Sequence, residues 1–344
     1  MKSILFLLLL FTSFTGTLVS AQTVSFDNVK FFEDTSVLNV TIKTDMVKVF
    51  RQKEKTGAKF PANFSVQFEN GSQINEPIVL EIRGHFRKNF CYIPPLKVIF
   101  KNKKTSVLKP LGALKLVNQC KTPEMYQQYL VSEFLVYKMF NLLTDKSLRV
   151  RLLNLKLIDS TGRKKTIDEN AFLMENEKRF AKRNNFTVLK TDKVKYNLTD
   201  RRQMTLVDLF EYMIGNTDWG VSVGHNVQLF HSKNDSFALT YVVPYDFDYS
   251  GFVNTDYSSP APNLNISSVR ERIYRGFPRS LNEINEALAI FKKQQENMYA
   301  LINNCNLLTS KTKRSLTGYL DGFFEIIKKP DDVKRIFVEN ARSD

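Results

Sequence analysis

The sequence predicts an α+β protein with a β-rich first part and a mainly helical second part. Up to about residue 158, polar and apolar residues alternate or β-branched residues follow one another, which is typical of strands. After about residue 166, apolar residues recur at the spacing of a helix face. The 344 residues are 43% hydrophobic and include only 13 Gly and 11 Pro, so the composition excludes a disordered or collagen-like chain.

The first residues have the pattern of a secretory signal peptide. Lys2 supplies a positive charge, residues 4–11 are all apolar, and residues 19–21 fit the small-x-small rule of signal peptidase. This apolar run is shorter than the roughly 20 residues of a membrane span, and no later segment is apolar enough. We therefore predict export to the periplasm, the cell surface or the medium, with no transmembrane segment after cleavage. The predicted parts are a signal peptide at 1–21, a β-rich lobe at 22–165 and a helical lobe at 166–344.

The β-rich part contains several strand patterns and one helix pattern. Apolar residues from Tyr126 to Leu143 follow helical spacing, so a helix is expected there. Cys91 and Cys120 could pair after export, but three free buried thiols agree equally well with the sequence. The expected strands are residues 36–42, 64–68, 78–83, 96–100 and 148–152.

The helical part contains an expected β-hairpin, with strands at 226–231 and 237–243. The pair Ser280 and Glu283 and the pair Ser268 and Glu271 each have the spacing of a capping box, which predicts a helix start at both places. Further helices are expected at 204–214 and 316–327.

The chain is strongly basic, with a formal charge of +15, or +14 once Lys2 is removed. This charge favours an anionic partner or surface. The basic residues are scattered, and no recognition motif accompanies them, so no dedicated nucleic-acid binding is expected.

A polar constellation surrounds the expected hairpin. Asp218 follows a helix, Asn226 opens the first strand of the hairpin, and Asp246 and Asp248 follow its second strand. Because a hairpin brings its two ends together, Asn226 and Asp246 should be neighbours. Two carboxylates about 4 Å apart repel by about 4 kcal/mol at an effective dielectric near 20, so such a group favours a divalent cation. Oxygen ligands suit Mg²⁺ or Mn²⁺, as phosphoryl transfer requires.

A plainer interpretation of the same residues is also open. Asp218 could cap a loop, Asn226 could form a turn, and the Asp246-Phe247-Asp248 stretch could be a polar strand end. His225 could assist chemistry or be structural.

The constellation resembles the CotH-type secreted kinase-like family, in which N-x-D is followed by H-N and then by P-[WY]-D-[FL]-D. It is more similar still to a group of exported bacterial proteins. The resemblance covers residues 82–344 and includes the motifs Arg83-Gly-His-Phe-Arg87, Cys91, Pro94-Pro-Leu-Lys97, Leu114-Lys-Leu-Val117, Arg149-Val-Arg-Leu152, Gly215-Asn-Thr-Asp-Trp219, Val243-Pro-Tyr-Asp-Phe-Asp-Tyr-Ser-Gly251 and Ser268-Val-Arg-Glu-Arg272.

The resemblance implies a bilobal, protein-kinase-like fold with a nucleotide between the lobes. Asp218 would then be the catalytic Asp, Asn226 and Asp246 would bind the metal, and Lys97 would bind phosphates. The strand position of Lys97 also agrees with a phosphate contact, although a solvent-facing lysine fits equally.

Three further residues are candidates for the nucleotide site. Glu133 could hold Lys97 or be a surface residue, and the guanidinium fork of Arg87 suits phosphate oxygens. Glu175 is expected where the lobes join, facing the adenine.

We therefore expect an exported phosphotransferase that uses Mg-ATP on a protein or envelope acceptor. The chain lacks G-x-G-x-x-G and H-R-D, and Asp218 and Asn226 are eight residues apart instead of five. These departures leave two alternatives: an inactive pseudokinase-like module that binds anionic surface partners, and a nucleotidyl transferase.

Overall fold

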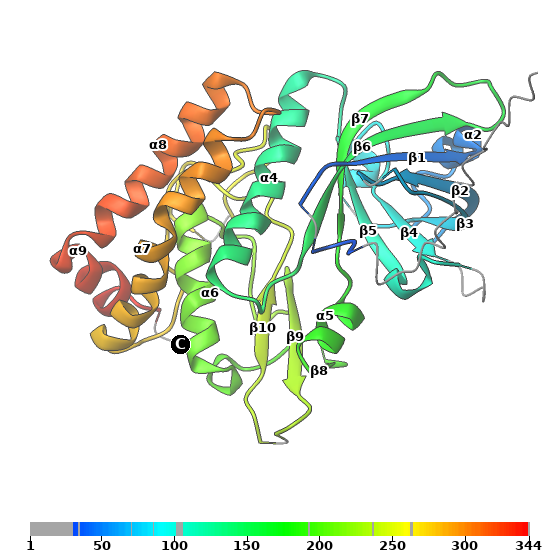
Figure 1. Ribbon diagram of the computed structural model, residues 1–344. Helices are drawn as coiled ribbons and strands as arrows, with labels where there is room; N and C mark the ends of the chain where they lie inside the picture. Colours follow the sequence, from blue (N-terminus) through cyan, green and yellow to red (C-terminus); the bar gives the residue numbers. More distant parts are fainter. Residues whose placement is uncertain are drawn as a thin grey trace, which may run out of the picture.

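The computed structural model describes residues 30–342, apart from 34, 70, 85, 101–105, 192, 236 and 262–263. The expected signal peptide at 1–21 lies outside the described residues. Figure 1 shows a strand-rich half beside a group of helices, with a small sheet below the helices.

The strand-rich half is a closed, seven-stranded β-barrel. Its strands follow the order β1-β2-β3-β4-β5-β7-β6, and every neighbouring pair is antiparallel except β1 and β6. The parallel pair closes the barrel, with Leu38 opposite Leu153 and Thr44 opposite Asp159. The strands are β1 (Leu38–Thr44), β2 (Lys59–Gln67), β3 (Gln73–Ile82), β4 (Leu96–Phe100), β5 (Ala113–Asn118), β6 (Val150–Asp159) and β7 (Ile167–Met174).

The alternation along these strands builds the barrel core. Every second side chain of β1 and β3 is buried, as expected for strands with one face inside a barrel. Ile42, Leu80 and Leu155 are among the fully buried residues of this core. The barrel continues to the end of β7, nine residues beyond the boundary at 165 expected from the sequence.

The bilobal, protein-kinase-like fold expected from the resemblance is wrong for this chain. The structure is a closed seven-stranded barrel with a small three-stranded sheet and C-terminal helices. The physical reason is the pairing of β1 with β6, which lie more than 100 residues apart. Strand periodicity shows which side chains face a core, but it does not show which distant strands pair.

The four longest helices pack side by side next to the barrel (Figure 1). The core that they form continues into the barrel through α4, whose Tyr137 ring lies 5.7 Å from Phe172 of β7 and 4.7 Å from Phe247. The helices are α2 (Met46–Arg51), α3 (Arg87–Phe90), α4 (Glu124–Leu143), α5 (Glu177–Arg183), α6 (Arg201–Ile214), α7 (Leu281–Asn303), α8 (Ser310–Ile327) and α9 (Pro330–Lys334), with short helical turns η1 (Lys109–Leu111), η2 (Tyr196–Leu198) and η3 (Arg335–Glu339).

The small sheet has the order β10-β9-β8 and contains the expected hairpin. Its strands are β8 (Phe186–Val188), β9 (Val227–Ser232) and β10 (Tyr241–Pro244). The capping box predicted at Ser280 and Glu283 is confirmed at the start of α7. The helix start predicted at Ser268 is wrong, because the Glu271 carboxylate closes only a turn and the chain runs on without helix to Ser280.

Two further features concern the whole chain. Cys91 and Cys120 form a disulfide that joins the end of α3 to the segment before α4, whereas Cys305 is free. In the part of the chain that the structure describes, no helix is both long and apolar enough to span a bilayer.

Candidate functional site

The candidate site lies where the end of α6, the hairpin, α4 and the barrel strands β4 and β5 meet. Gly215 ends α6 in a left-handed conformation with φ of 65°. A side chain at this position would also clash with the Tyr319 hydroxyl, so the sharp turn requires glycine. The turn directs the chain into the Asn216-Thr217-Asp218 loop.

Asp218 and Asn226 are in direct contact. The Asn226 amide donates to the Asp218 carbonyl at 2.7 Å and to the Asp218 carboxylate at 3.0 Å. The other carboxylate oxygen lies 2.9 Å from Nε2 of His225. Partial burial raises the pKa of Asp218, and the nearby His225 opposes this effect. The carboxylate is therefore held in a fixed orientation.

The two ends of the hairpin also meet. The amide of Tyr245 donates to the Asn226 carbonyl at 3.0 Å. Asn226 has φ of 52° and Asp246 has φ of 67°, and both are left-handed conformations that are uncommon outside glycine. Such conformations cost energy and are often found at functional sites.

Asp246 and Asp248 have different surroundings. The main-chain amide of Asp246 donates a hydrogen bond to the Tyr137 hydroxyl at 2.8 Å. The Asp246 carboxylate has no hydrogen bond or ion pair among the described residues. Asp248 is buried and accepts a hydrogen bond from the Tyr257 hydroxyl at 2.9 Å. Burial, followed by the charge of Asp246, raises the pKa of Asp248 to about 6. Phe247 between them is fully buried.

Glu133, which was expected to hold Lys97, joins this acidic group instead, and Arg87 lies beside the group. Glu133 is only 2% exposed, and burial together with Asp248 and Asp246 raises its pKa well above the usual range. Burial lowers the pKa of Arg87, but the nearby Tyr257, Asp248 and Glu133 reverse this effect and raise it overall. Arg87 also donates to the Asn118 carbonyl at 2.9 Å.

Lys97 forms an ion pair with Glu81 of the neighbouring strand at 2.8 Å. The lysine that sequence reasoning missed is Lys115, directly opposite Lys97 on β5. Its ammonium lies 3.8 Å from the centre of the Tyr245 ring, beside Asp246. Burial and the charge of Arg83 lower the pKa of Lys115 to about 8. The sequence could have pointed to Lys115, because this residue belongs to the Leu114-Lys-Leu-Val117 motif of the resemblance.

Glu175 is a structural residue of the junction. It is 1% exposed, and its carboxylate accepts hydrogen bonds from Arg183 and from the main-chain amide of Arg149. Beside it lies a cavity of about 600 Å³, lined in part by Lys97, Lys115 and Gln228. The side-chain oxygen of Gln228 is buried and has no hydrogen-bond partner in the described part of the chain. The cavity therefore offers both cations and an unused acceptor.

The donor set suits a hard cation. Among the described residues, no group of three or more His, Cys, Asp or Glu side chains has the arrangement of a metal site. Mg²⁺, however, usually keeps several waters and is held by one or two carboxylates together with substrate phosphates. The unpartnered Asp246 carboxylate fits this requirement, and Asn226 directs its amide nitrogen to Asp218, which leaves its oxygen available. Asp248 is the second carboxylate.

A scan of the chain against protein-family models gives no match, and a search of curated proteins gives none either.

Proposed function

We propose that this chain is an exported phosphotransferase that moves the γ-phosphoryl group of Mg-ATP to a hydroxyl of a protein or envelope acceptor. One observation carries the proposal: Lys115 lines a cavity of nucleotide size and also contacts Tyr245, next to the unpartnered carboxylate of Asp246. Cations for phosphate and an acid for a metal therefore adjoin a pocket for a ligand.

The cavity of about 600 Å³ is within the usual range for small-molecule sites. Met174 and Leu111 supply apolar lining, and Gln228 supplies a hydrogen-bond acceptor for an amino group. Lys115 is the better candidate for phosphate than Lys97, because Glu81 already neutralises Lys97. Lys115 has no acidic partner in hydrogen-bonding range among the described residues.

Asn226, Asp246 and Asp248 are the residues that would hold Mg²⁺. When bound, the ion would neutralise phosphate charge between these residues and the nucleotide. Asp218 would orient the acceptor hydroxyl and take its proton. A new bond forms between the hydroxyl oxygen and the γ-phosphorus, the bond from that phosphorus to the bridging oxygen breaks, and ADP leaves.

Export is part of the proposal. The disulfide between Cys91 and Cys120 supports it, because such bonds persist mainly in oxidising compartments. The signal-peptide pattern of the sequence agrees with the same compartment.

The test uses the purified mature chain, Mg²⁺, an envelope fraction, and ATP labelled at either the α or the γ phosphate. We expect label from γ-labelled ATP in the acceptor, and a higher melting temperature with Mg-ATP. Label from α-labelled ATP alone would indicate a nucleotidyl transferase. Absence of both label transfer and stabilisation would refute the proposal.

A further inference from the structure

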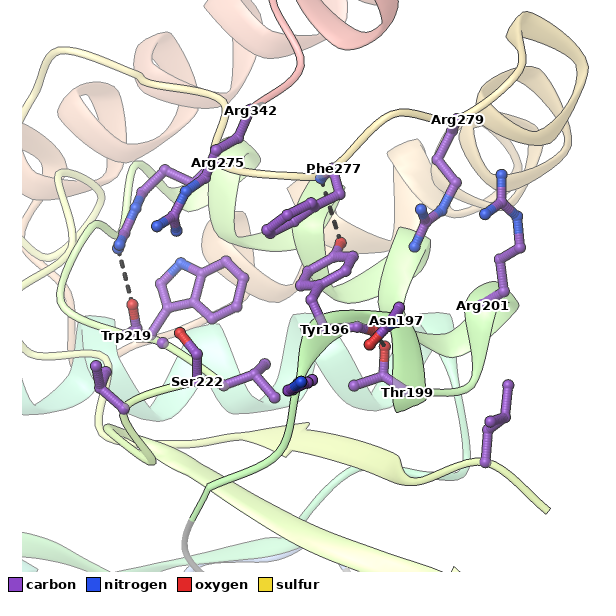
Figure 2. Close-up of a pocket in the computed structure, with 15 residues that line it drawn as sticks. Tyr196, Asn197, Thr199, Arg201, Trp219, Ser222, Arg275, Phe277, Arg279 and Arg342 are labelled. Atoms are coloured by element: carbon purple, nitrogen blue, oxygen red, sulfur yellow. Dashed lines mark hydrogen bonds between the residues drawn. The ribbon is translucent and has the colours of Figure 1, made fainter. Parts of the chain in front are cut away.

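A second cavity lies next to Asp218, and the proposed phosphoryl transfer gives no role to its side chains. Its volume is about 970 Å³, and it is lined by the loop from Trp219 to Val223, by η2 and by the segment from Arg275 to Arg279 (Figure 2). Trp219 directly follows Asp218 in the chain. The cavity and the candidate site are therefore separated by one short loop.

Aromatic rings form one part of this cavity. Tyr196 and Phe277 are stacked with their ring centres 3.9 Å apart. The indole of Trp219 lies beside this pair in Figure 2, and its buried N–H has no hydrogen-bond partner among the residues that the structure describes. These rings offer apolar faces to a ligand.

The charged lining is basic, with five cations and no Asp or Glu among the described residues that line the cavity. Three of the cations are engaged: Arg201 pairs with Glu283, Arg279 donates to Thr205, and one nitrogen of Arg275 donates to two carbonyls. The other two, Lys195 and Arg342, are exposed, and neither side chain has an ion pair or hydrogen bond in the part of the chain that the structure describes.

Two buried acids of α6 lie close to the cavity but do not line it. Asp208 and Glu211 are each 1% exposed, and burial raises the pKa of both well above the usual range. Burial therefore favours the protonated form of each carboxyl. The Tyr196 hydroxyl donates to Asp208, which holds the ring in place.

Arg275 connects the cavity to the catalytic loop. Its guanidinium donates to the carbonyls of Thr217 and Trp219, at 2.5 and 2.8 Å, and so spans Asp218. A ligand bound against Arg275 would consequently lie beside the residue that is proposed to accept the proton.

We propose that this cavity binds a compact organic anion, a sugar that carries a phosphate or a carboxylate, and presents it as the acceptor. The role as acceptor rests on the proposed function, whereas the binding of the anion does not. Lys195, Arg275 and Arg342 supply charge-assisted hydrogen bonds, and the rings cover the apolar face of the sugar. A cavity of this size suits one small ligand and not a long acidic chain.

Trp219 is the only tryptophan of the chain, so its fluorescence reports directly on this cavity. We would titrate glucose 6-phosphate, glucuronate and glucose without nucleotide. We expect the fluorescence of Trp219 to change saturably with either anion and not to change with glucose. The Lys195→Ala/Arg342→Ala variant should bind the anions roughly tenfold or more weakly. The Lys311→Ala/Arg314→Ala variant, which removes the same charge from an exposed part of α8, should bind like the wild type.

Unchanged affinity in the Lys195→Ala/Arg342→Ala variant, or no fluorescence change with either anion, would overturn the inference. Binding of a hexaglutamate peptide in preference to both sugars would instead assign the cavity to acidic peptides and would also overturn it. Anion binding without any ATP-dependent transfer would refute the proposed function alone. Transfer that the Lys195→Ala/Arg342→Ala variant leaves unchanged would refute only the role of the cavity in acceptor binding.

Discussion

The two cavities on either side of the Asp218 loop differ in how their charges are compensated. In the cavity beside the barrel, Lys97 and Lys115 lie near acids, and the adjoining Asp246 carboxylate has no hydrogen bond or ion pair among the described residues. Near the cavity beside Trp219, Asp208 and Glu211 are buried with raised pKa values and do not line the cavity, while Lys195 and Arg342 are exposed. The first arrangement suits a metal with a polyphosphate, and the second suits an anion without a metal. In the proposed phosphotransferase, the Asp218 loop would therefore serve two ligands of different chemistry.

The largest expected effect is that of Asp246→Asn, which removes the unpartnered carboxylate but keeps the size of the side chain. We expect phosphoryl transfer to fall about a thousandfold or more, because the loss of electrostatic stabilisation at a reacting phosphate has effects of this size. The melting-temperature rise with Mg-ATP should also disappear. Asp168→Asn, at an exposed position of β7, is the matched control. Full activity of the Asp246→Asn protein would contradict the proposal that Asp246 binds Mg²⁺.

The two lysines of the first cavity should differ in effect. Lys115→Met should weaken ATP binding about tenfold or more, because it removes a cation that forms no ion pair among the described residues. Lys97→Met should have a smaller effect, because Lys97 is already paired with Glu81. Isothermal titration with ATP and Mg²⁺ measures both. A larger loss for Lys97→Met would restore Lys97 as the phosphate-binding lysine.

The buried acids behind the second cavity make stability depend on pH. The pKa of Asp208 is higher in the folded than in the unfolded state, so between these two values only the folded state keeps the proton. The free energy of unfolding contributed by this group therefore decreases as the pH rises above about 4. Asp208→Asn should reduce this decrease, as measured by urea unfolding at pH 5 and pH 8. Asp168→Asn should keep the slope of the wild type, and an equal slope in Asp208→Asn would show that Asp208 is ionised.

The smallest effect is expected at Arg201. Its ion pair with Glu283 is largely exposed, and such pairs contribute about 1 kcal/mol or less. Arg201→Ala should therefore change the free energy of unfolding little. It should also leave anion affinity at Trp219 nearly unchanged, because Arg201 is already neutralised. A tenfold loss of affinity in the fluorescence titration would place Arg201 among the cations that bind the ligand.

Local patterns in the sequence were good guides to individual elements. The helix at Tyr126–Leu143 is α4, and the expected hairpin is β9 and β10, because each depends on periodicity within a short segment. The hairpin also explains why the proximity of Asn226 and Asp246 could be predicted. The partners of Lys97 and Glu133 could not be predicted. Lys97 meets Glu81 through the register of β3 and β4, and Glu133 meets Asp248 through the packing of α4.

The sequence by itself determined β1 to β4, β6, the four longest helices, the hairpin and the polar residues around it, since these depend on neighbours a few positions apart. It did not predict β5, β7, β8 or the short helices. Only the tertiary structure decided the closure of the barrel through β1 and β6, the disulfide, the position of Lys115 and the basic cavity at Trp219. Each of these joins segments that are far apart in the chain. Their proximity is set by the burial of whole faces of strands and helices. The residue pattern within one segment does not show which distant segment will cover its apolar face.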